Sequence, residues 1–368
     1  KKLVRYRRDF RAFASEQLKL MGQPLNFWPC QIPLIESVER QFKDRGFARC
    51  IWLKARQVGS STLAQAFVAW RTMLWPHTSA LVIADEAKRA ENLFEISRSF
   101  YDHLDDDIRP VGRYVTKREL VFANPSTATR TADPGLRSRI TVESAHKKNL
   151  AIGAAWQVVH LSECARYPNP AFVLDGVIPS VHRVPGTMLI LESSAEMAGS
   201  WFRELCEASA RGETAFDFKF VPWYLQPEYQ ICPMCHKTYP MVCTDQRHRE
   251  QGVSFLELSA EERHMVAEFG LHAGHIKWMR EKMSEMGNDW DLFRQSYPLT
   301  PDDAWVTPGA QVFPAKCLRD LRAGVEPPKR MGEVYSGPKV LDSPRGRLWI
   351  WSEPQPGKAY DIGVDVAM

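Results

Sequence analysis

The stretch Lys54-Ala-Arg-Gln-Val-Gly-Ser-Ser-Thr62 decides the fold, because it has the form of a loop that holds nucleotide phosphates between a strand and a helix. The apolar run Cys50-Ile-Trp-Leu53 before it predicts the strand, and Thr62-Leu-Ala-Gln-Ala-Phe-Val-Ala-Trp70 after it predicts the helix. Gly59 permits the close backbone approach that such a loop needs. An ordinary strand, turn and helix is the alternative interpretation.

The loop departs from the usual pattern at one position. A Lys normally stands directly before the Ser or Thr that holds magnesium, and it neutralises the β- and γ-phosphates. Ser60 stands there in this chain, so we expect Lys54 or Arg56 at the loop entrance to supply the positive charge. Ser61 is expected to bind magnesium. The residues expected to surround the phosphates are Gln57, Val58, Gly59, Ser60, Ser61 and Thr62.

Two later runs repeat the pattern of an apolar strand that ends in polar residues. Trp156-Gln-Val-Val-His-Leu161 is followed by Ser162 and Glu163, and a Glu at the edge of a parallel sheet can polarise the water that attacks the γ-phosphate. The Asp that usually precedes this Glu is replaced by Ser162. Thr187-Met-Leu-Ile-Leu191 is followed by Glu192-Ser-Ser-Ala195, whose hydroxyl groups can sense the γ-phosphate. A buried strand with a solvated Glu and a plain strand-to-loop turn are the respective alternatives.

Apolar runs alternate with helical stretches between residues 47 and 225. Ala80-Leu-Val-Ile-Ala84, for example, precedes Glu86-Ala-Lys-Arg-Ala-Glu-Asn-Leu-Phe-Glu95. This alternation predicts an α/β fold with a mainly parallel sheet and helices on both faces. Further along, Ser259 with Glu262 predicts a capping box at the start of another helix.

Several metal-binding side chains gather in one short segment that is rich in turn-forming residues. Cys232-Pro-Met-Cys235 offers two thiolates to one tetrahedral zinc ion, and Cys243 with either His248 or His236 can complete four ligands. Free thiols in a surface insertion are the alternative. A redox role is disfavoured, because the pair does not begin a thioredoxin-like helix.

Length and composition favour a soluble intracellular enzyme. The 368 residues are enough for two domains, and the start shows no cleavable signal segment. No run of about 18 apolar residues occurs. Eight cysteines without a secretory signal are expected to stay reduced. The net charge of +4 is too small to demonstrate a polyanionic partner, although the basic residues of 1–8 and Arg11 can lie against phosphates or form a solvated helix face.

Taken in this order, the motifs resemble those of the large terminase subunit, the ATP-driven DNA-packaging motor of tailed bacteriophages. In that family the lysine of the phosphate loop, the Walker A motif, is often shifted toward the start of the loop, as Lys54 is here. Phe27-Trp28-Pro-Cys-Gln31 is similar to the family's adenine-reading segment. Tyr297-Pro-Leu-Thr-Pro-Asp-Asp-Ala-Trp305 is similar to the segment that closes its ATPase domain.

The resemblance implies roles for further residues. Gln31 is expected to pair with the adenine edge, and Ser193 with Ser194 is expected to couple ATP hydrolysis to movement. A ring of such subunits would also use an arginine from the neighbouring subunit. Arg137 and Arg139 are the candidates for this arginine, and a DNA-contacting or merely solvated role is the alternative for both.

The end of the chain resembles the first strand of the family's RNase H-like nuclease. Within Tyr360-Asp-Ile-Gly-Val-Asp-Val-Ala367, Asp365 matches the first metal-binding carboxylate. Cleavage by two Mg²⁺ or Mn²⁺ ions about 4 Å apart needs several carboxylates, and only three residues follow Asp365. We therefore expect this chain not to cut DNA, and a version extended by a complete nuclease domain to do so.

The resemblance also implies a domain order. The expected parts are a helical, adenine-reading segment at 1–45, a P-loop (RecA/ASCE-like) ATPase core at 46–225, a zinc-binding insertion at 226–252, the helical end of the ATPase domain at 253–323, and a linker with the first nuclease strand at 324–368.

ATP, Mg²⁺ and, at the insertion, Zn²⁺ are the expected cofactors. The implied partners are double-stranded DNA, a small terminase subunit and the portal protein of the procapsid, with no membrane. A homo-oligomeric ring would dock on that portal in the host bacterial cytoplasm. Two other interpretations remain open: a two-lobed helicase-type ATPase, and a non-catalytic nucleic-acid-binding or capsid-assembly module.

Overall fold

The computed structural model divides into two compact units, Lys1–Pro308 and Gly309–Met368. The structure describes residues 1–147, 155–196, 200–241, 243–248, 256–305, 328–334, 340–343, 348–353, 355 and 358. The expected nuclease strand with Asp365 lies outside these residues. Within these ranges, every helix is too short or too polar to cross a bilayer.

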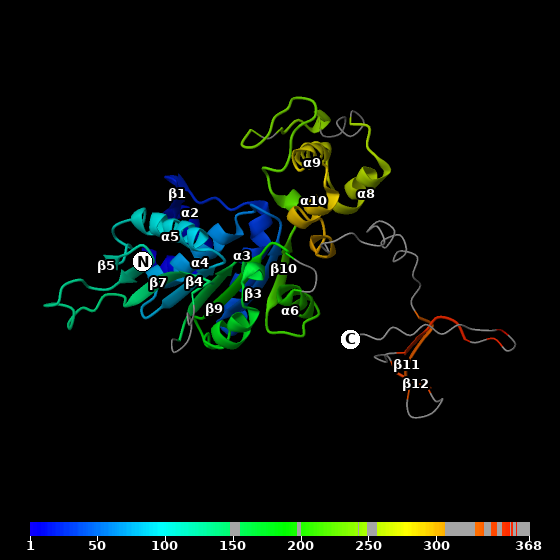
Figure 1. Ribbon diagram of the computed structural model, residues 1–368. Coiled ribbons are helices and arrows are strands. Elements are labelled where there is room, and N and C mark those ends of the chain that lie inside the picture. Colours follow the sequence, from blue (N-terminus) through cyan, green and yellow to red (C-terminus); the bar gives the residue numbers. More distant parts are fainter. Residues whose placement is uncertain are drawn as a thin grey trace. The chain divides into compact units, whose positions relative to one another are not determined.

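The first unit is built around an eight-stranded sheet with the order β10-β3-β9-β8-β4-β7-β6-β5 (Figure 1). The strands from β10 to β7 run parallel, and β6 and β5 are added antiparallel at one edge. The sheet confirms the predicted α/β fold with mainly parallel strands. Its strands are β3 (Ala48–Lys54), β4 (Ser79–Ala84), β5 (Gly112–Val115), β6 (Glu119–Phe122), β7 (Ser138–Ser144), β8 (Val158–Ser162), β9 (Met188–Ser193) and β10 (Asp217–Val221).

Strand β3 lies at a point where the order of the strands reverses. It has β10 on one side and β9 on the other, and the chain leaves it through α4 (Ser60–Leu74) to reach β4, beyond β9 and β8. In open parallel sheets, ligands bind outside the carboxyl ends of the strands at such a point. The topology therefore predicts a ligand-binding site at the loop between β3 and α4.

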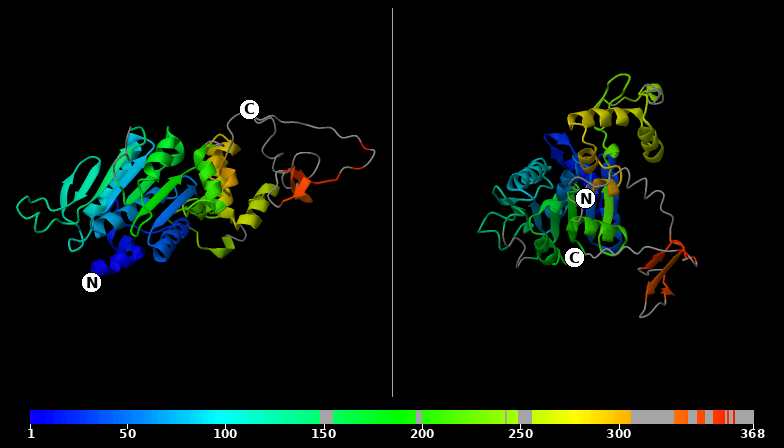
Figure 2. Two further views of the ribbon diagram at one scale, coloured as in Figure 1. Left: turned by 90° about the horizontal axis from the view of Figure 1, so that it is seen from below. Right: turned by 45° about the vertical axis from the view of Figure 1, so that its right-hand side comes forward.

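Two hydrophobic cores cover the two faces of this sheet. Every residue of β3, β8 and β9 is buried, which explains why their sequences are nearly continuous apolar runs. Along β3, Cys50 and Trp52 belong to one core, together with residues of α3 (Ile32–Arg45) and α4. Ile51 and Leu53 belong to the other, with Phe202 of α6 (Trp201–Ala210). Figure 2 shows helices on both sides of the strands, as predicted.

The other elements around the sheet are one long helix, whose Leu93, Phe94 and Phe100 belong to the first core, and several short elements. They are α5 (Ala87–Asp102), the 3-10 turn η2 (Cys164–Arg166) and the one-turn π-helix η3 (Phe172–Val177). The N-terminal region contributes α1 (Lys2–Arg8), α2 (Phe10–Gln17), the hairpin of β1 (Lys19–Leu20) and β2 (Gln23–Pro24), and η1 (Pro29–Gln31).

Basic side chains near the N-terminus bond within the protein. Lys2 pairs with Asp105, Arg5 with Glu16 and Arg11 with Glu39, and Arg7 donates to the carbonyl of Leu74. These contacts favour the interpretation of the basic stretch as the outer face of two helices.

A helical layer follows β10. It consists of η4 (Trp223–Leu225), α8 (Ala260–Phe269), α9 (Ala273–Glu285), α10 (Trp290–Ser296) and η5 (Asp302–Ala304). The predicted capping box is present, because the N–H of Glu262 donates to Ser259 Oγ at 3.1 Å and the N–H of Ser259 donates to Glu262 Oε2 at 2.8 Å. Arg280 of α9 bonds to both oxygens of the same Glu262 carboxylate at 2.7 Å, which joins α9 to the start of α8.

The described part of the second unit is a small antiparallel sheet with the order β12-β11-β13. Its strands are β11 (Arg330–Val334), β12 (Val340–Asp342) and β13 (Leu348–Ile350).

Candidate functional site

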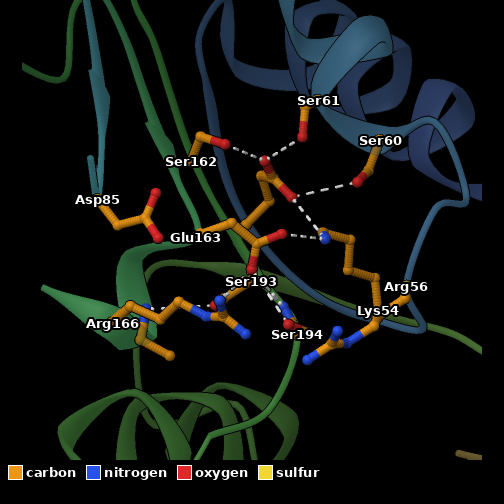
Figure 3. A network of polar contacts seen from close by, with 12 residues as sticks. Lys54, Arg56, Ser60, Ser61, Asp85, Ser162, Glu163, Arg166, Ser193 and Ser194 are labelled. Carbon is orange, nitrogen blue, oxygen red and sulfur yellow. Dashed lines mark hydrogen bonds and ion pairs between the residues drawn. The ribbon is translucent and has the colours of Figure 1, made fainter. Parts of the chain in front are cut away.

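The carboxyl ends of β3, β8 and β9 meet the loop of residues 55–59 and the first turn of α4 (Figure 3). This arrangement brings together residues that the sequence presented in three separate motifs. They are Lys54 and Ser61 beside the loop, Glu163 after β8, and Ser193 and Ser194 at the end of β9.

The loop has the geometry of an anion-binding turn. Gln57 and Gly59 have φ angles of 55° and 70°, in the left-handed region, and Gly59 is the N-cap of α4. A Cβ atom on Gly59 would lie 2.5 Å from Gln31 Nε2, and the φ of 70° would strain any residue with a side chain, so glycine is favoured there. The first N–H groups of a helix have no partner within the helix, and the helix dipole adds positive charge at the same end. The start of α4 is thus suited to bind phosphate.

Lys54 points along this edge toward two carboxylates. Its Nζ donates to Glu163 Oε1 at 2.7 Å and lies 3.4 Å from Glu192 Oε2, and the side chain is almost fully buried. Burial alone would lower the pKa of the Lys54 ammonium, but the two carboxylates outweigh it and raise this pKa above its usual value. The ammonium is therefore a permanent charge beside the loop.

Glu163 is held in an unusual backbone conformation. Its φ of 51° and ψ of 42° are left-handed, which is uncommon for a residue with a Cβ and is often found at functional sites. Its Oε2 accepts from the N–H and the hydroxyl of Ser194, both at 3.1 Å, and from the Ser193 hydroxyl at 3.3 Å. Burial and the nearby Glu192 would raise the pKa of the Glu163 carboxyl, but Lys54 and the N–H of Ser194 lower it. Glu163 is thus an ionised acceptor at the mouth of the loop.

Glu192 is a central residue of the site to which the sequence interpretation gave no role. It is fully buried on β9 and lies in register beside Ser162 of β8. Its carboxylate accepts from the hydroxyls of Ser61 at 2.6 Å, Ser162 at 2.8 Å and Ser60 at 3.1 Å. Burial would raise the pKa of the Glu192 carboxyl, but Lys54 and His160 lower it strongly. The available signal was an acidic residue at the end of an apolar strand, directly before Ser193.

Gln31 and Arg56, both expected at the ATP site, flank the loop. Gln31 Nε2 donates to the carbonyl of Gly59 at 3.0 Å, which places the expected adenine-reading residue against the loop backbone. Arg56 is exposed at the loop entrance, and its backbone N–H donates to the carbonyl of Ser296 at 3.0 Å.

Arg137 and Arg139, the candidates for the arginine that acts on a neighbouring subunit, have different surroundings. Arg137 is exposed, whereas the Arg139 guanidinium lies over the ring of Trp156, 5.3 Å from its centroid. Both stand near the amino end of β7, the opposite edge of the sheet from Lys54. Within this chain they do not reach the loop, and their expected role concerns a neighbouring subunit only.

Two other arginines approach the site in this chain, and the sequence interpretation did not single them out. Arg89 pairs with Asp85 at 2.9 Å, and its guanidinium lies 4.0 Å from Glu163 Oε1. Arg166, beside Glu163 in Figure 3, pairs with Glu196 at 2.5 Å.

A second candidate site lies in the segment after η4. One ligand atom each from Cys232, Cys235, Cys243 and His248 lies within 4.8 Å of all the others. A tetrahedral zinc ion with bonds of about 2.3 Å holds its sulfur ligands roughly 3.8 Å apart, so the cluster is close to that geometry. Burial would raise the pKa of the Cys232 thiol, but the N–H groups of Cys235 and Met234 lower it to about 6, which favours the metal-binding thiolate.

Of the two histidines proposed for this cluster, His248 lies beside the cysteines and His236 does not. His248 Nδ1 lies 3.5 Å from Cys243 Sγ and 3.7 Å from Cys232 Sγ. His236 Nδ1 instead lies 2.7 Å from the ammonium of Lys277 on α9. The donor set of three cysteines and His248 therefore fits a metal ion.

Direct contacts connect the cysteine segment to the phosphate loop. The Tyr229 hydroxyl donates to the carbonyl of Arg56 at 2.8 Å, and the Tyr229 ring stacks on Trp278 of α9 with centroids 4.4 Å apart. The N–H of Ile231, directly before Cys232, donates to the carbonyl of Gly274 in α9 at 3.0 Å. The segment that carries Cys232 and the loop entrance thus contact the same helical layer.

Among solved structures, bacteriophage large terminases have folds similar to this chain. The HK97 bacteriophage large terminase matches with a TM-score of 0.49 and 14% identity, over 71% of this chain and 53% of that one. The ATPase domain of the Thermus phage P74-26 large terminase matches with 0.43 and 16%, over 66% and 92%. A large terminase from a thermophilic bacteriophage, in complex with ADP, matches with 0.40 and 10%, over 54% and 46%.

The chain is structurally similar to phage large terminase ATPase domains. At these identities the likeness concerns the fold alone, and the chain spans about half the length of the HK97 protein. No protein-family model and no curated protein matches the chain.

Proposed function

We propose that this chain is the ATPase part of a large terminase subunit, a motor that hydrolyses ATP to drive double-stranded viral DNA into a procapsid. One observation carries the proposal. At the carboxyl edge of a parallel sheet, beside the reversal of strand order, a left-handed loop and a helix start meet a buried Lys54 and a buried, ionised Glu163. Phosphate binding and water activation need these groups at one place.

The phosphates of ATP would bind at the loop backbone from Gln57 to Ser61, and Lys54 and Arg56 would supply the positive charge. Magnesium bound with ATP neutralises charge on the phosphate oxygens, and the Ser61 hydroxyl would hold the ion. Glu163, kept ionised and oriented by Ser194, would accept a proton from the attacking water.

Movement would begin at the bonds between Glu163 and the end of β9. Ser193 and Ser194 both donate to Glu163. A movement of this carboxylate would therefore change the hydrogen bonds of the end of β9 and of the segment after it. Gln31 would read adenine, and Arg137 or Arg139 would act on the ATP site of a neighbouring subunit in a ring.

The proposed partners follow from the same role. A motor must ignore DNA sequence, so contacts to duplex DNA would be made mainly to its phosphates. A small terminase subunit would select the DNA, and the ring would dock on the portal protein of the procapsid in the host bacterial cytoplasm. Asp365 would serve a two-metal nuclease only within a complete RNase H-like domain.

The cluster of Cys232, Cys235, Cys243 and His248 would hold one Zn²⁺ ion. Zinc would hold these four side chains together and, through Tyr229, steady the entrance of the phosphate loop. Its role in this proposal is structural, because all four positions of a tetrahedral ion are filled by protein ligands.

Nucleotide binding and turnover by the purified chain test the proposal. We expect Mg²⁺-dependent ATP hydrolysis, measured as phosphate release. A well-folded chain that neither binds nor hydrolyses ATP would contradict it and favour a non-catalytic module.

A further inference from the structure

The site lacks an acidic residue where P-loop ATPases usually have one. In that class, magnesium is held by the Ser or Thr of the loop and by an Asp of a second strand. Ser162 stands at the corresponding position of β8, directly before Glu163. A hydroxyl there cannot supply the negative charge that this arrangement uses.

Glu192 of the adjacent strand β9 reaches the same place. Its Oε1 atom accepts from Ser162 Oγ at 2.8 Å and from Ser61 Oγ at 2.6 Å. A hydroxyl that donates its proton to a carboxylate keeps its oxygen lone pairs for a metal ion. The bond from Ser61 to Glu192 therefore prepares Ser61 as a magnesium ligand.

Neighbouring side chains fix the orientation of this carboxylate. The Ser97 hydroxyl donates to Gln65 Oε1 at 2.7 Å, so the Gln65 amide nitrogen faces His160 Nδ1, also at 2.7 Å. With Nδ1 accepting, His160 carries its proton on Nε2, which faces Glu192 Oε1 at 3.4 Å. Glu192 thus accepts hydrogen bonds from the serine hydroxyls and has the buried His160 ring beside it.

The buried charges beside the loop have a net negative sum, which favours the binding of a cation. Glu163 and Glu192 are both buried and share the ammonium of Lys54. The nearby Asp85 is matched by its own partner, Arg89. Two buried carboxylates with one buried cation carry a net negative charge, which a divalent ion beside Ser61 would offset.

We propose that Glu192 replaces the missing acid of β8: it holds the Ser61 hydroxyl toward magnesium and supplies the negative charge for the ion. In this chain the acidic residue stands on β9, at Glu192, and not on the neighbouring strand β8, where Ser162 stands. This inference rests on the proposed ATPase function. Glu192 acts through Ser61 and is a positioning residue, whereas Glu163 remains the group that activates water.

Nucleotide binding with and without magnesium tests this role. The probe is a fluorescent ADP analogue, titrated in MgCl₂ and in EDTA. The quantity measured is the dissociation constant in EDTA divided by the dissociation constant in MgCl₂. For Glu192→Gln we expect this ratio to fall by about tenfold or more, with binding in EDTA not weakened. Glu281→Gln, at an exposed position of α9 outside the site, is the control and should keep the ratio of the wild type.

A charge-swap variant separates this role from simple stabilisation. Glu192→Ser should lose the magnesium effect, and the double variant Ser162→Asp/Glu192→Ser should regain it, because it restores an acid on β8. Ser162→Asp alone would place two carboxylates side by side and should destabilise the fold.

The outcomes distinguish this inference from the function on which it rests. An unchanged ratio in Glu192→Gln, or a folded double variant that regains nothing, would overturn the role of Glu192 while the ATPase proposal stands. A wild-type chain that binds no nucleotide would overturn both.

Discussion

The Nζ atom of Lys54 lies 2.7 Å from Oε1 of Glu163, and both side chains are buried. The proposed phosphate-binding cation and the proposed catalytic base are therefore direct partners. Removing one member of a buried ion pair typically costs about 3–5 kcal/mol of stability, because the other charge is left uncompensated. Substitutions here thus change folding stability as well as chemistry, and each activity measurement needs a melting temperature beside it.

Lys54→Ala should weaken ATP binding and hydrolysis strongly and lower the melting temperature. The reason is its double contact with Glu163 and Glu192 at the loop edge. Lys88→Ala is the matched control, because Lys88 is 79% exposed on α5. ATP titration and phosphate release measure the first effect, and thermal unfolding measures the second. Equally small effects of both substitutions would assign the phosphate-binding charge to Arg56 or to a neighbouring subunit.

The acid side of the stability profile should depend on Glu192. The fold lowers the pKa of this carboxyl below its usual value of 4.5, so its ionised form stabilises the folded state at higher pH. This contribution is complete above pH 4.5 and is lost as the pH falls through the lowered pKa of the folded state. Melting temperature should therefore decline less steeply in acid for Glu192→Gln than for the wild type. Glu281→Gln, on the exposed face of α9, should leave the profile unchanged, and an identical slope in all three proteins would refute the prediction.

Protein purified without chelator should contain about one zinc ion per chain. Cys235→Ser should lower the zinc content, whereas Cys206→Ala, which removes a thiol of α6 outside the cluster, should not. Elemental analysis measures both. Chelation should also lower the melting temperature, since Ile231, directly before Cys232, bonds to Gly274 of α9. A metal-free protein whose melting temperature is unaffected by chelator would rule the site out.

Ser259→Ala should destabilise the helical layer by about 1 kcal/mol, because it removes the side-chain acceptor of the capping box. Ser284→Ala, at an exposed position of α9, should change stability by less than about 0.5 kcal/mol. Denaturant unfolding with equal m-values allows the comparison. Similar small effects of the two substitutions would show that Arg280, and not the cap, holds Glu262 in place.

The sequence predicted the elements whose signals are local. The apolar run before Lys54, the helix after Gly59 and the capping box at Ser259 all lie where expected, since each depends on residues within a few positions of one another. The cysteine cluster was predictable for the same reason. Its spacing alone left His236 and His248 as alternatives, and only their positions in space separate them.

What the sequence did not predict depends on the order and register of distant strands. Nothing local shows that β9 lies between β3 and β8, yet this neighbourhood puts Glu192 beside both Ser61 and Ser162. The antiparallel strands β5 and β6 were missed for a related reason, because their short runs give little periodic signal. The partners of the N-terminal basic residues, such as Asp105 for Lys2, are likewise far away in the sequence.

ATP turnover by Glu163→Gln tests the central claim most directly. Gln keeps the shape of the side chain but cannot accept a proton from water, so we expect nucleotide affinity close to that of the wild type and turnover lower by roughly 10²-fold or more. Single-turnover phosphate release and titration with an ATP analogue give the two quantities on the same preparations. Turnover equal to that of the wild type, with the protein folded and nucleotide bound, would contradict the assignment of Glu163 as the base.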